Sequence, residues 1–530
     1  MLPAFIAILL LVAVSVYRAC ACLRRSLAGE TARRTGALML ASGAVWMLVF
    51  GSRLTLAHGR VSWAPYLDQW YAEVSGLLVP LVHGHLGWRD LFSGNNEHRV
   101  ILTRCASLVE VLVNGSWDNQ VRVTSVFALQ ATAVAWVSLL AWQSLGFPRG
   151  SVVAAAAVLP MGLVCDWENM VSGFQDQFGF MILGSLVAFS LLGDWGALLI
   201  ALLMLGSMAS GLLTAAALAA VTLLTAAGDR TRLRAAIAFS LGCGAVVALG
   251  WFTRERFPPV PGLYADGWAT WFAAFLAYAS WPLPPTPLGA ACLWLPCLLL
   301  AAATLGGRNG TRFGRFCLAL GTWVVLQACA LAWSRASLRG LVSARYTEVL
   351  SWGFVANVGA LLVLVSEGGA PAWKKRLLYA GIVPWSVWIG ASEAWRSEHV
   401  YRPYLEVFRQ QTIEHERRLG SFMRSNDPHI IDSVTFPHIP GTASELIALL
   451  RDKELQERLP GPLRRDGVRD RDPSRLAGIR DGPLSQLVKG LFRCRFWVLG
   501  AAAAAALASV IAARRSAGMD GSSAAAPPTP

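Results

Sequence analysis

The sequence predicts an all-α fold, a polytopic bundle of about 13 transmembrane helices. Hydrophobic residues make up 55% of the 530 residues, and charged residues make up only 15%. A soluble protein carries about 25% charged residues. The charges also cluster, so windows of about 20 uncharged residues recur, which is the length that a helix needs to cross hydrocarbon. Because these windows do not alternate in polarity, helices rather than barrel strands would satisfy the backbone in lipid.

The predicted spans follow the apolar windows in order. Residues 1–17 form a first span with its N-terminus outside, because arginines follow it. The longer windows after it are 36–52, 123–148, 177–193, 195–228, 235–253, 316–334 and 349–366. As one helix, 195–228 would be about 51 Å long, so we expect two spans, divided around Ser207, Ser210 and Gly211. The segment before 281–287, which is rich in proline, is not expected to be a full span.

The charge distribution predicts the orientation and the division of the chain. The net charge is +14, and its arginines lie mainly in short connections, as the positive-inside rule expects. No basic stretch is interleaved with aromatics, so a nucleic-acid partner is not indicated. We expect a transmembrane core at 1–392, with interfacial helices in an external loop at 58–122. An external helical segment at 393–490 would contain amphipathic helices at 404–419 and 442–459. A last span at 491–515 and a disordered tail at 516–530 follow.

Two acids in the external loop are candidate catalytic groups. Asp68 and Glu73 flank Trp70 in the stretch 65–73. A carboxylate beside aromatics at a membrane boundary is partly desolvated, which can raise its pKa toward working pH and suit it to act as a general base. The alternative is a solvated acid paired with a nearby arginine. Trp70 is a candidate substrate contact, or else part of an interfacial aromatic belt.

A short charged motif precedes the next apolar stretch. Asn96, Glu97, His98 and Arg99 combine an amide, an acid, a titratable ring and a guanidinium. Arginine recognises phosphate through two parallel hydrogen bonds, so the motif is a candidate phosphate site, with Asn96 as a substrate contact and Glu97 as an orienting acid. The alternative is a set of side chains that anchor the helix by reaching the interface.

Two further outward regions supply candidates. Trp167, Glu168 and Gln175 lie between two predicted spans and suit sugar faces and hydroxyls, although helix capping is the alternative. A basic cluster lies outside against the positive-inside trend, which suggests that it binds phosphate or, alternatively, anionic lipid head groups. Its members are Arg335, Arg339 and Arg345, the last followed by Tyr346 at the start of a span.

The order of these motifs resembles the first external loop of the GT-C-type membrane glycosyltransferases, and also a group of largely uncharacterised bacterial membrane proteins. The resemblance spans roughly residues 1–350 and is carried by Asp68-x-Trp70, Asn96–Arg99, Trp167–Asn169, Gly173–Gln175 and Arg345-Tyr346. It implies that Asp68 is the catalytic base and that His98 and Arg99 meet the lipid phosphate. The paired acids and the Lys-Pro-Pro stretch of some GT-C families are absent.

The resemblance implies transfer of a sugar from a polyprenyl-phosphate donor to a glycan, lipid or protein acceptor, at the outer face of a bacterial cytoplasmic membrane. Two other functions stay open, namely a lipid-linked glycan transporter or flippase, and a membrane assembly factor that acts through 393–490. The ten cysteines form no CxxC pair, and no metal motif is present. Carboxylates at an outward cleft could still bind a divalent cation.

Overall fold

The computed structural model describes residues 32–227, 229–254, 262–307, 311–338, 342–367, 372–432, 442–463 and 482–522. The predicted first span at 1–17, Arg339 and the end of the predicted tail lie outside these ranges. The described chain is helical, and its one isolated β-bridge joins Asn95 to His98. The predicted all-α class is therefore confirmed for the part of the chain that the structure describes.

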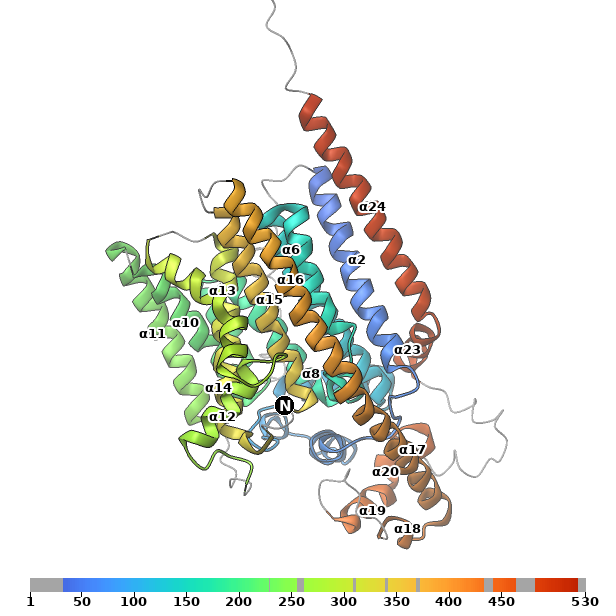
Figure 1. The fold of residues 1–530 in the computed structure, drawn as a ribbon. Coiled ribbons are helices and arrows are strands. Elements are labelled where there is room, and N and C mark those ends of the chain that lie inside the picture. The colour runs from blue at the N-terminus through green and yellow to red at the C-terminus, as the bar shows by residue number, and fades with distance from the viewer. Residues whose placement is uncertain are drawn as a thin grey trace, which may run out of the picture.

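Long helices form a bundle, and short elements gather near its ends (Figure 1). The bundle comprises α2 (Ala32–Ala57), α6 (Asn119–Met161), α8 (Asp176–Ser190), α9 (Trp195–Met204), α10 (Leu212–Ala226), α11 (Arg230–Phe252), α12 (Trp268–Ala279), α13 (Pro287–Leu305), α14 (Arg312–Ser334), α15 (Ala344–Glu367), α16 (Ala372–Arg396) and α24 (Arg495–Ser522). The elements outside the bundle are the long helix α17 (Arg402–Ser425) and the shorter η1 (Gln69–Leu78), α3 (Val79–Val82), α4 (Trp88–Phe92), α5 (Ile101–Asn114), α7 (Trp167–Val171), η2 (Gly173–Gln175), η3 (Ala209–Gly211), η4 (Ala336–Leu338), η5 (Ser397–Tyr401), α18 (His429–Asp432), α19 (Ala443–Arg451), α20 (Lys453–Gln456), η6 (Gly461–Leu463) and α23 (Pro483–Arg493).

Within the described ranges, eight helices are long and apolar enough to cross a membrane. They are α2, α6, α10 together with η3, α11, α13, α14, α15 and α24. The apolar helices α9 and α12 are shorter than a full span, as expected for the segment before 281–287. The set fits a multi-pass membrane protein, while the total of about 13 spans stays a prediction.

Three glycines allow the chain to change direction inside apolar windows. In α6 the backbone leaves the helical region at Gly146 (φ 76°, ψ 167°), and the chain folds back. A Cβ on Gly150 would lie 2.7 Å from the Cα of Trp142, so only glycine permits this contact. Between α9 and α10, a Cβ on Gly211 would lie 2.0 Å from the carbonyl oxygen of Met204. The predicted division of 195–228 is therefore confirmed, but only η3 with α10 is long enough for a span, since α9 has 10 residues.

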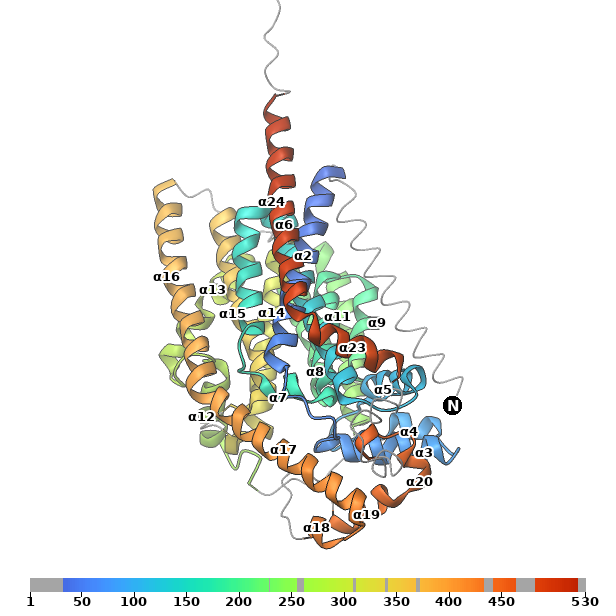
Figure 2. The same ribbon diagram turned by 90° about the vertical axis from the view of Figure 1, so that its right-hand side faces the viewer.

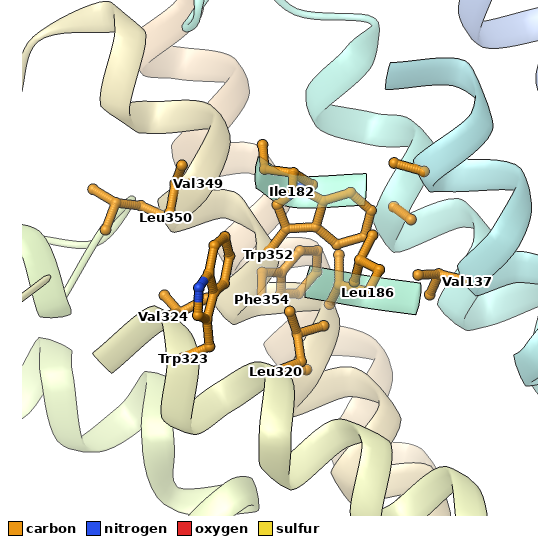
Figure 3. Close-up of a cluster of buried hydrophobic side chains, with 14 of the residues drawn as sticks. Val137, Ile182, Leu186, Leu320, Trp323, Val324, Val349, Leu350, Trp352 and Phe354 are labelled. Carbon is orange, nitrogen blue, oxygen red and sulfur yellow. The ribbon is translucent and has the colours of Figure 1, made fainter. Parts of the chain in front are cut away.

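The core lies where α6, α8, α14 and α15 pack together. Figure 3 shows part of it, including Ile182 and Leu186 from α8, Trp323 from α14 and Trp352 from α15. Of the apolar window in α15, 83% is buried inside the protein, against 11% in α24. Helix α15 is thus the central helix of the bundle, and its first turn is held firmly in place by its neighbours.

The two ends of the bundle differ in charge. Arg149 at the bend of α6 donates to Ser366 near the end of α15, and Arg312 donates to the carbonyl of Ser190. These two arginines, whose connections the positive-inside pattern predicts to be cytoplasmic, therefore lie at one end of the bundle. The elements η1, α3, α4 and α17–α20 lie at the opposite end, where α17 extends away from α16 (Figure 2).

The helices α17–α20, here called the cap, dock on η1 through an apolar cluster. The cluster buries Trp70 and Val74 of η1 against Leu419 and Phe422 of α17 and Leu446 of α19. At the edge of this contact, ion pairing joins Arg60 to Glu406 at 2.9 Å. The amphipathic helices predicted at 404–419 and 442–459 coincide with α17 and with α19 and α20.

Candidate functional site

A small pocket at the cap end brings together five of the predicted site residues. They are Asp68, Trp167, Glu168, Gln175 and Arg345. The other lining residues are Tyr66, Leu67, Val171, Ser172 and Phe174. The pocket holds about 10 Å³, which is room for about one water molecule. Ligand entry therefore requires side chains at this pocket to move.

Asp68 enters the pocket from an unusual backbone conformation. Leu67, directly before it, has φ +45°, a left-handed conformation that costs about 1–2 kcal/mol for an L-residue. Such conformations persist where the surrounding structure enforces them, often at functional sites. Asp68 is half-buried, and its carboxylate forms no hydrogen bond or ion pair with any residue that the structure describes. The Asp68 carboxylate is therefore not held by another side chain of the described structure.

Arg345 faces the same pocket from the first turn of α15. Its Nε and Nη2 both contact one oxygen of Glu168, at 2.8 and 2.7 Å. The hydroxyl of Ser343 donates to the other Glu168 oxygen at 2.9 Å. Asn169 holds the backbone as well, because its amide donates to the Arg345 carbonyl at 3.0 Å and to Glu348 at 2.8 Å. Glu168 and Asn169, two consecutive residues of α7, thus hold the side chain and the backbone carbonyl of Arg345.

The cap closes the rim of the pocket. The ring of Phe408, on α17, lies 4.8 Å from the ring of Tyr66 in a T-shaped arrangement and 5.0 Å from the ring of Trp167. Phe408 is only 3% exposed. Burial, followed by the negative charge of Glu168, raises the pKa of Tyr66, so its phenol stays protonated at neutral pH. The lid is therefore apolar, with one uncharged hydroxyl beneath it.

A second group of predicted residues forms an adjacent cluster. Arg335 donates to Glu97 at 2.6 Å and to the hydroxyl of Tyr346 at 3.2 Å. The hydroxyl of Tyr278 donates to the Arg335 carbonyl at 3.0 Å. Burial alone would raise the pKa of Glu97, but the interactions with His98 and Arg335 outweigh it and lower the pKa. Glu97 is therefore an anion that holds Arg335.

His98 connects the two groups electrostatically. Its Nδ1 accepts the backbone N–H of Ala209 at 3.3 Å, which leaves the proton of the neutral ring on Nε2, 3.9 Å from Glu97. Burial lowers the pKa of His98 despite the opposing charge of Glu97, so the ring is neutral at pH 7. The charges of Asp68 and Arg345 also act on His98, which places the pocket and the cluster side by side.

Glu73 lies outside the pocket, in a buried ionic network. It is fully buried and pairs with Arg122 at 2.9 Å. Arg122 also contacts Asp176 at 2.8 Å and Glu110 at 3.2 Å. Burial, opposed by Arg122, raises the pKa of Glu73. The network ties η1 to α6, α8 and α5, so the structure gives Glu73 a role in positioning the helix that begins after Asp68.

Three other predicted residues lie apart from the pocket. Trp70 is 1% exposed and packs in the cap cluster. Arg99 donates to the carbonyls of Gly250 and Thr253 at the end of α11. Asn96 is exposed in a turn with φ +52°. Arg339 lies outside the described residues.

Several residues of the site were not predicted. Tyr66 stands two positions before Asp68, and Asn169 directly follows Glu168, so proximity in sequence was an available signal for both. Phe408 lies 340 positions from Asp68, in an amphipathic helix whose buried residues recur mostly at intervals of three or four positions. No local pattern distinguishes Phe408 from the cap core.

In the described part of the chain, no three His, Cys, Asp or Glu side chains are grouped so that they could hold a metal ion. The site offers instead an uncommitted carboxylate and a guanidinium in one occluded pocket, beside a second arginine–carboxylate pair. No protein-family model matches the chain, and no curated protein matches its sequence significantly. The fold and the site thus define an all-helical protein with several membrane-compatible spans and a polar pocket beneath a helical cap.

Proposed function

We propose that this protein is a membrane glycosyltransferase that moves a sugar from a polyprenyl-phosphate donor to a cell-envelope acceptor. The observation that carries the proposal is that Asp68, without an ion-pair partner in the described structure, shares a pocket with Arg345. A general base must be free to accept a proton, and a phosphate leaving group needs a cation.

In the proposed reaction, Asp68 accepts the proton of an acceptor hydroxyl. The acceptor oxygen bonds to the anomeric carbon as the bond from that carbon to the phosphate oxygen breaks, so the configuration inverts. The phosphate leaves with the electron pair, and Arg345 stabilises its charge. Arg335, which is paired with Glu97, would give the lipid phosphate a second cationic contact. Catalysis here is positioning and electrostatic stabilisation.

The proposed location is the outer face of a bacterial cytoplasmic membrane. Support comes from the arginines at the opposite end of the bundle, such as Arg149 and Arg312, because basic connections favour the cytoplasmic side. The pocket end would then face the periplasm. A polyprenyl chain would lie in the bilayer beside the apolar helices while its phosphate reaches the pocket.

The test is sugar transfer in membranes that contain the full-length protein, with labelled polyprenyl-phosphate hexoses and pentoses as donors. We expect Asp68→Asn to lower transfer by about 10²–10⁴-fold, the usual contribution of a general base. Glu398→Gln is the matched control, since Glu398 is an exposed acid at the same end and pairs with Arg402. Full transfer by the Asp68→Asn variant would exclude Asp68 as the base.

A further inference from the structure

A histidine joins the loop helices to the cap, away from the pocket. His83 follows α3 directly. Its Nε2 lies 2.8 Å from an oxygen of Asp452, and its Nδ1 lies 3.0 Å from an oxygen of Glu454. Both carboxylates belong to the start of α20, where the Asp452 side chain also accepts the backbone N–H of Glu454. One imidazole thus bridges two acids of the cap.

The geometry requires a charged ring. A neutral imidazole has one N–H donor, and its second nitrogen carries a lone pair. Two ionised carboxylates at hydrogen-bond distance need two donors, which only the imidazolium supplies. The hydrogen bond to Asp452 raises the pKa of His83, and the charge of Glu454 acts in the same direction. The same contact contributes to lowering the pKa of Asp452, whose burial acts in the opposite direction.

Further titratable and charged groups lie on both sides of this contact. On the loop side, the ring of His85 stacks on His83 with centroids 6.1 Å apart. On the cap side, Glu457 and Arg458 follow α20 and face apolar residues of α3 and α5 across a hollow. The side chain of His83 is 36% exposed, so the ring exchanges protons with bulk solvent and its charge follows the external pH.

The two contacts of His83 lie at the boundary between the loop helices (η1, α3 and α5) and the cap, here called the seam. Two hollows also lie at this seam. One hollow, of about 370 Å³, separates η1 from α19 and is lined by Tyr71, Ser75 and Asp452, among others. The other, of about 310 Å³, separates α3 and α5 from the residues after α20, and Glu454 lines it. His83 bonds one carboxylate from each hollow. Release of this bridge would let the seam widen and join the two spaces.

We propose that His83 is a proton-operated latch that holds α19 and α20 against the loop helices and so controls opening of the seam between them. The imidazolium holds the cap at low pH, and loss of its proton leaves a nitrogen lone pair facing a carboxylate. Docking of the cap raises the pKa of His83. The protonated ring therefore contributes its full favourable free energy to docking below the ordinary His pKa of about 6.5, and this contribution is lost as the pH rises through the raised pKa of the docked state. This latch does not depend on the proposed transferase activity.

Hydrogen–deuterium exchange of the full-length protein in nanodiscs tests the latch, with protection corrected for the pH dependence of intrinsic exchange. We expect protection of 443–456 to fall about threefold from pH 6 to pH 8.5, within the range that exposed ion pairs give. At both pH values, His83→Gln should show the weak protection that the wild type shows at pH 8.5. His85→Gln should behave as the wild type does.

A second variant keeps the test decisive if His83→Gln folds poorly. Glu454 is 64% exposed, and Glu454→Gln removes one of the two charges that face the ring. We expect this variant to retain the cap and to reduce the pH-dependent change in protection to less than half. Protection of 443–456 that is independent of pH in the wild type, or equal pH dependence in the wild type and both latch variants, would overturn the proposal.

Discussion

Arg345 and Glu168 form an ion pair inside the candidate pocket, with Nε and Nη2 of the guanidinium 2.8 and 2.7 Å from one carboxylate oxygen. The pair is partly exposed, at 30% for Arg345 and 19% for Glu168. The guanidinium therefore already holds an anion at the place where the proposed reaction needs a phosphate. A bound phosphate must compete with Glu168, or share Arg345 with it.

The first prediction concerns this competition. Glu168→Gln removes the internal anion but keeps an oxygen that can accept from Arg345, so the guanidinium stays oriented while its charge becomes available. We expect affinity for polyprenyl phosphate to rise about three- to tenfold, which corresponds to roughly 1 kcal/mol for a partly exposed pair. Native mass spectrometry of the detergent-solubilised protein with added polyprenyl phosphate measures this.

The matched variant for that measurement is Arg345→Gln. It removes the charge-assisted donors, and we expect at least about tenfold weaker binding of the same lipid. If both variants bind polyprenyl phosphate as the wild type does, Arg345 does not contact the lipid phosphate, and the pair with Glu168 only fastens α7 to α15.

The second prediction separates the two acids of the first loop. Arg122 is surrounded by Glu73, Glu110 and Asp176, so three acids share one guanidinium in a buried site. Glu73→Gln removes excess negative charge and keeps hydrogen bonding, and should change stability by less than about 1 kcal/mol. Arg122→Met strands buried acids and should cost about 3–5 kcal/mol. Thermal unfolding followed by tryptophan fluorescence compares them.

Activity completes this comparison. Glu73→Gln should retain most sugar transfer under conditions where Asp68→Asn has lost it, because only Asp68 lies in the pocket. A Glu73→Gln protein that is as stable as the wild type but inactive would restore Glu73 as a catalytic candidate. It would also contradict the assignment of a positioning role to Glu73 and of the base to Asp68.

The sequence predicted those parts of the fold that depend on local composition. Apolar length predicted the long helices, and the small residues Ser207, Ser210 and Gly211 predicted the break between α9 and α10. The pocket was predicted in part, because Asp68, Glu168 and Arg345 stand in the polar stretches between apolar windows, where charged groups are conspicuous. The number of membrane spans is harder to predict from the sequence, because short helices such as α9 and α12 are as apolar as helices that are long enough to cross the membrane.

Contacts between residues that are distant in the sequence could not be predicted from local composition. Arg99 and Arg345 have the same chemistry and similar positions before or at a helix, yet Arg99 caps carbonyls of α11 while Arg345 faces the pocket. Glu73 is as acidic as Asp68, but its partner Arg122 lies 49 positions later in the sequence. Tertiary packing decides such outcomes, and a single sequence holds no record of it.

The third prediction concerns acid sensitivity. Burial lowers the pKa of His98 from its ordinary value of 6.5, so the unfolded chain binds a proton there at a higher pH than the folded chain does. Stability should therefore fall as the pH drops below about 6.5, and level off below the lowered pKa. His98→Asn keeps an acceptor for the Ala209 N–H but cannot be protonated.

We expect the melting temperature of His98→Asn to depend less on pH between 6.5 and 5 than that of the wild type. His429→Asn is the control, because His429 is exposed on α18 in the cap. Parallel melting curves for His98→Asn and the wild type across this pH range would show that His98 does not titrate with unfolding.

The last prediction concerns the lid. Phe408 packs against the rings of both Tyr66 and Trp167, two residues that line the pocket, and it reaches them from the cap. Truncation of a buried phenylalanine costs about 3–5 kcal/mol, partly through the cavity that remains. Phe408→Ala should therefore loosen the rim, and faster hydrogen exchange at 66–70 and 167–171 would report it. Tyr404→Ala, one turn earlier on α17 and 51% exposed, should leave these segments unchanged.

Because the closed pocket holds about one water, a looser lid should also speed association of polyprenyl phosphate. If exchange rises without faster association, lipid enters by a path that does not pass Phe408.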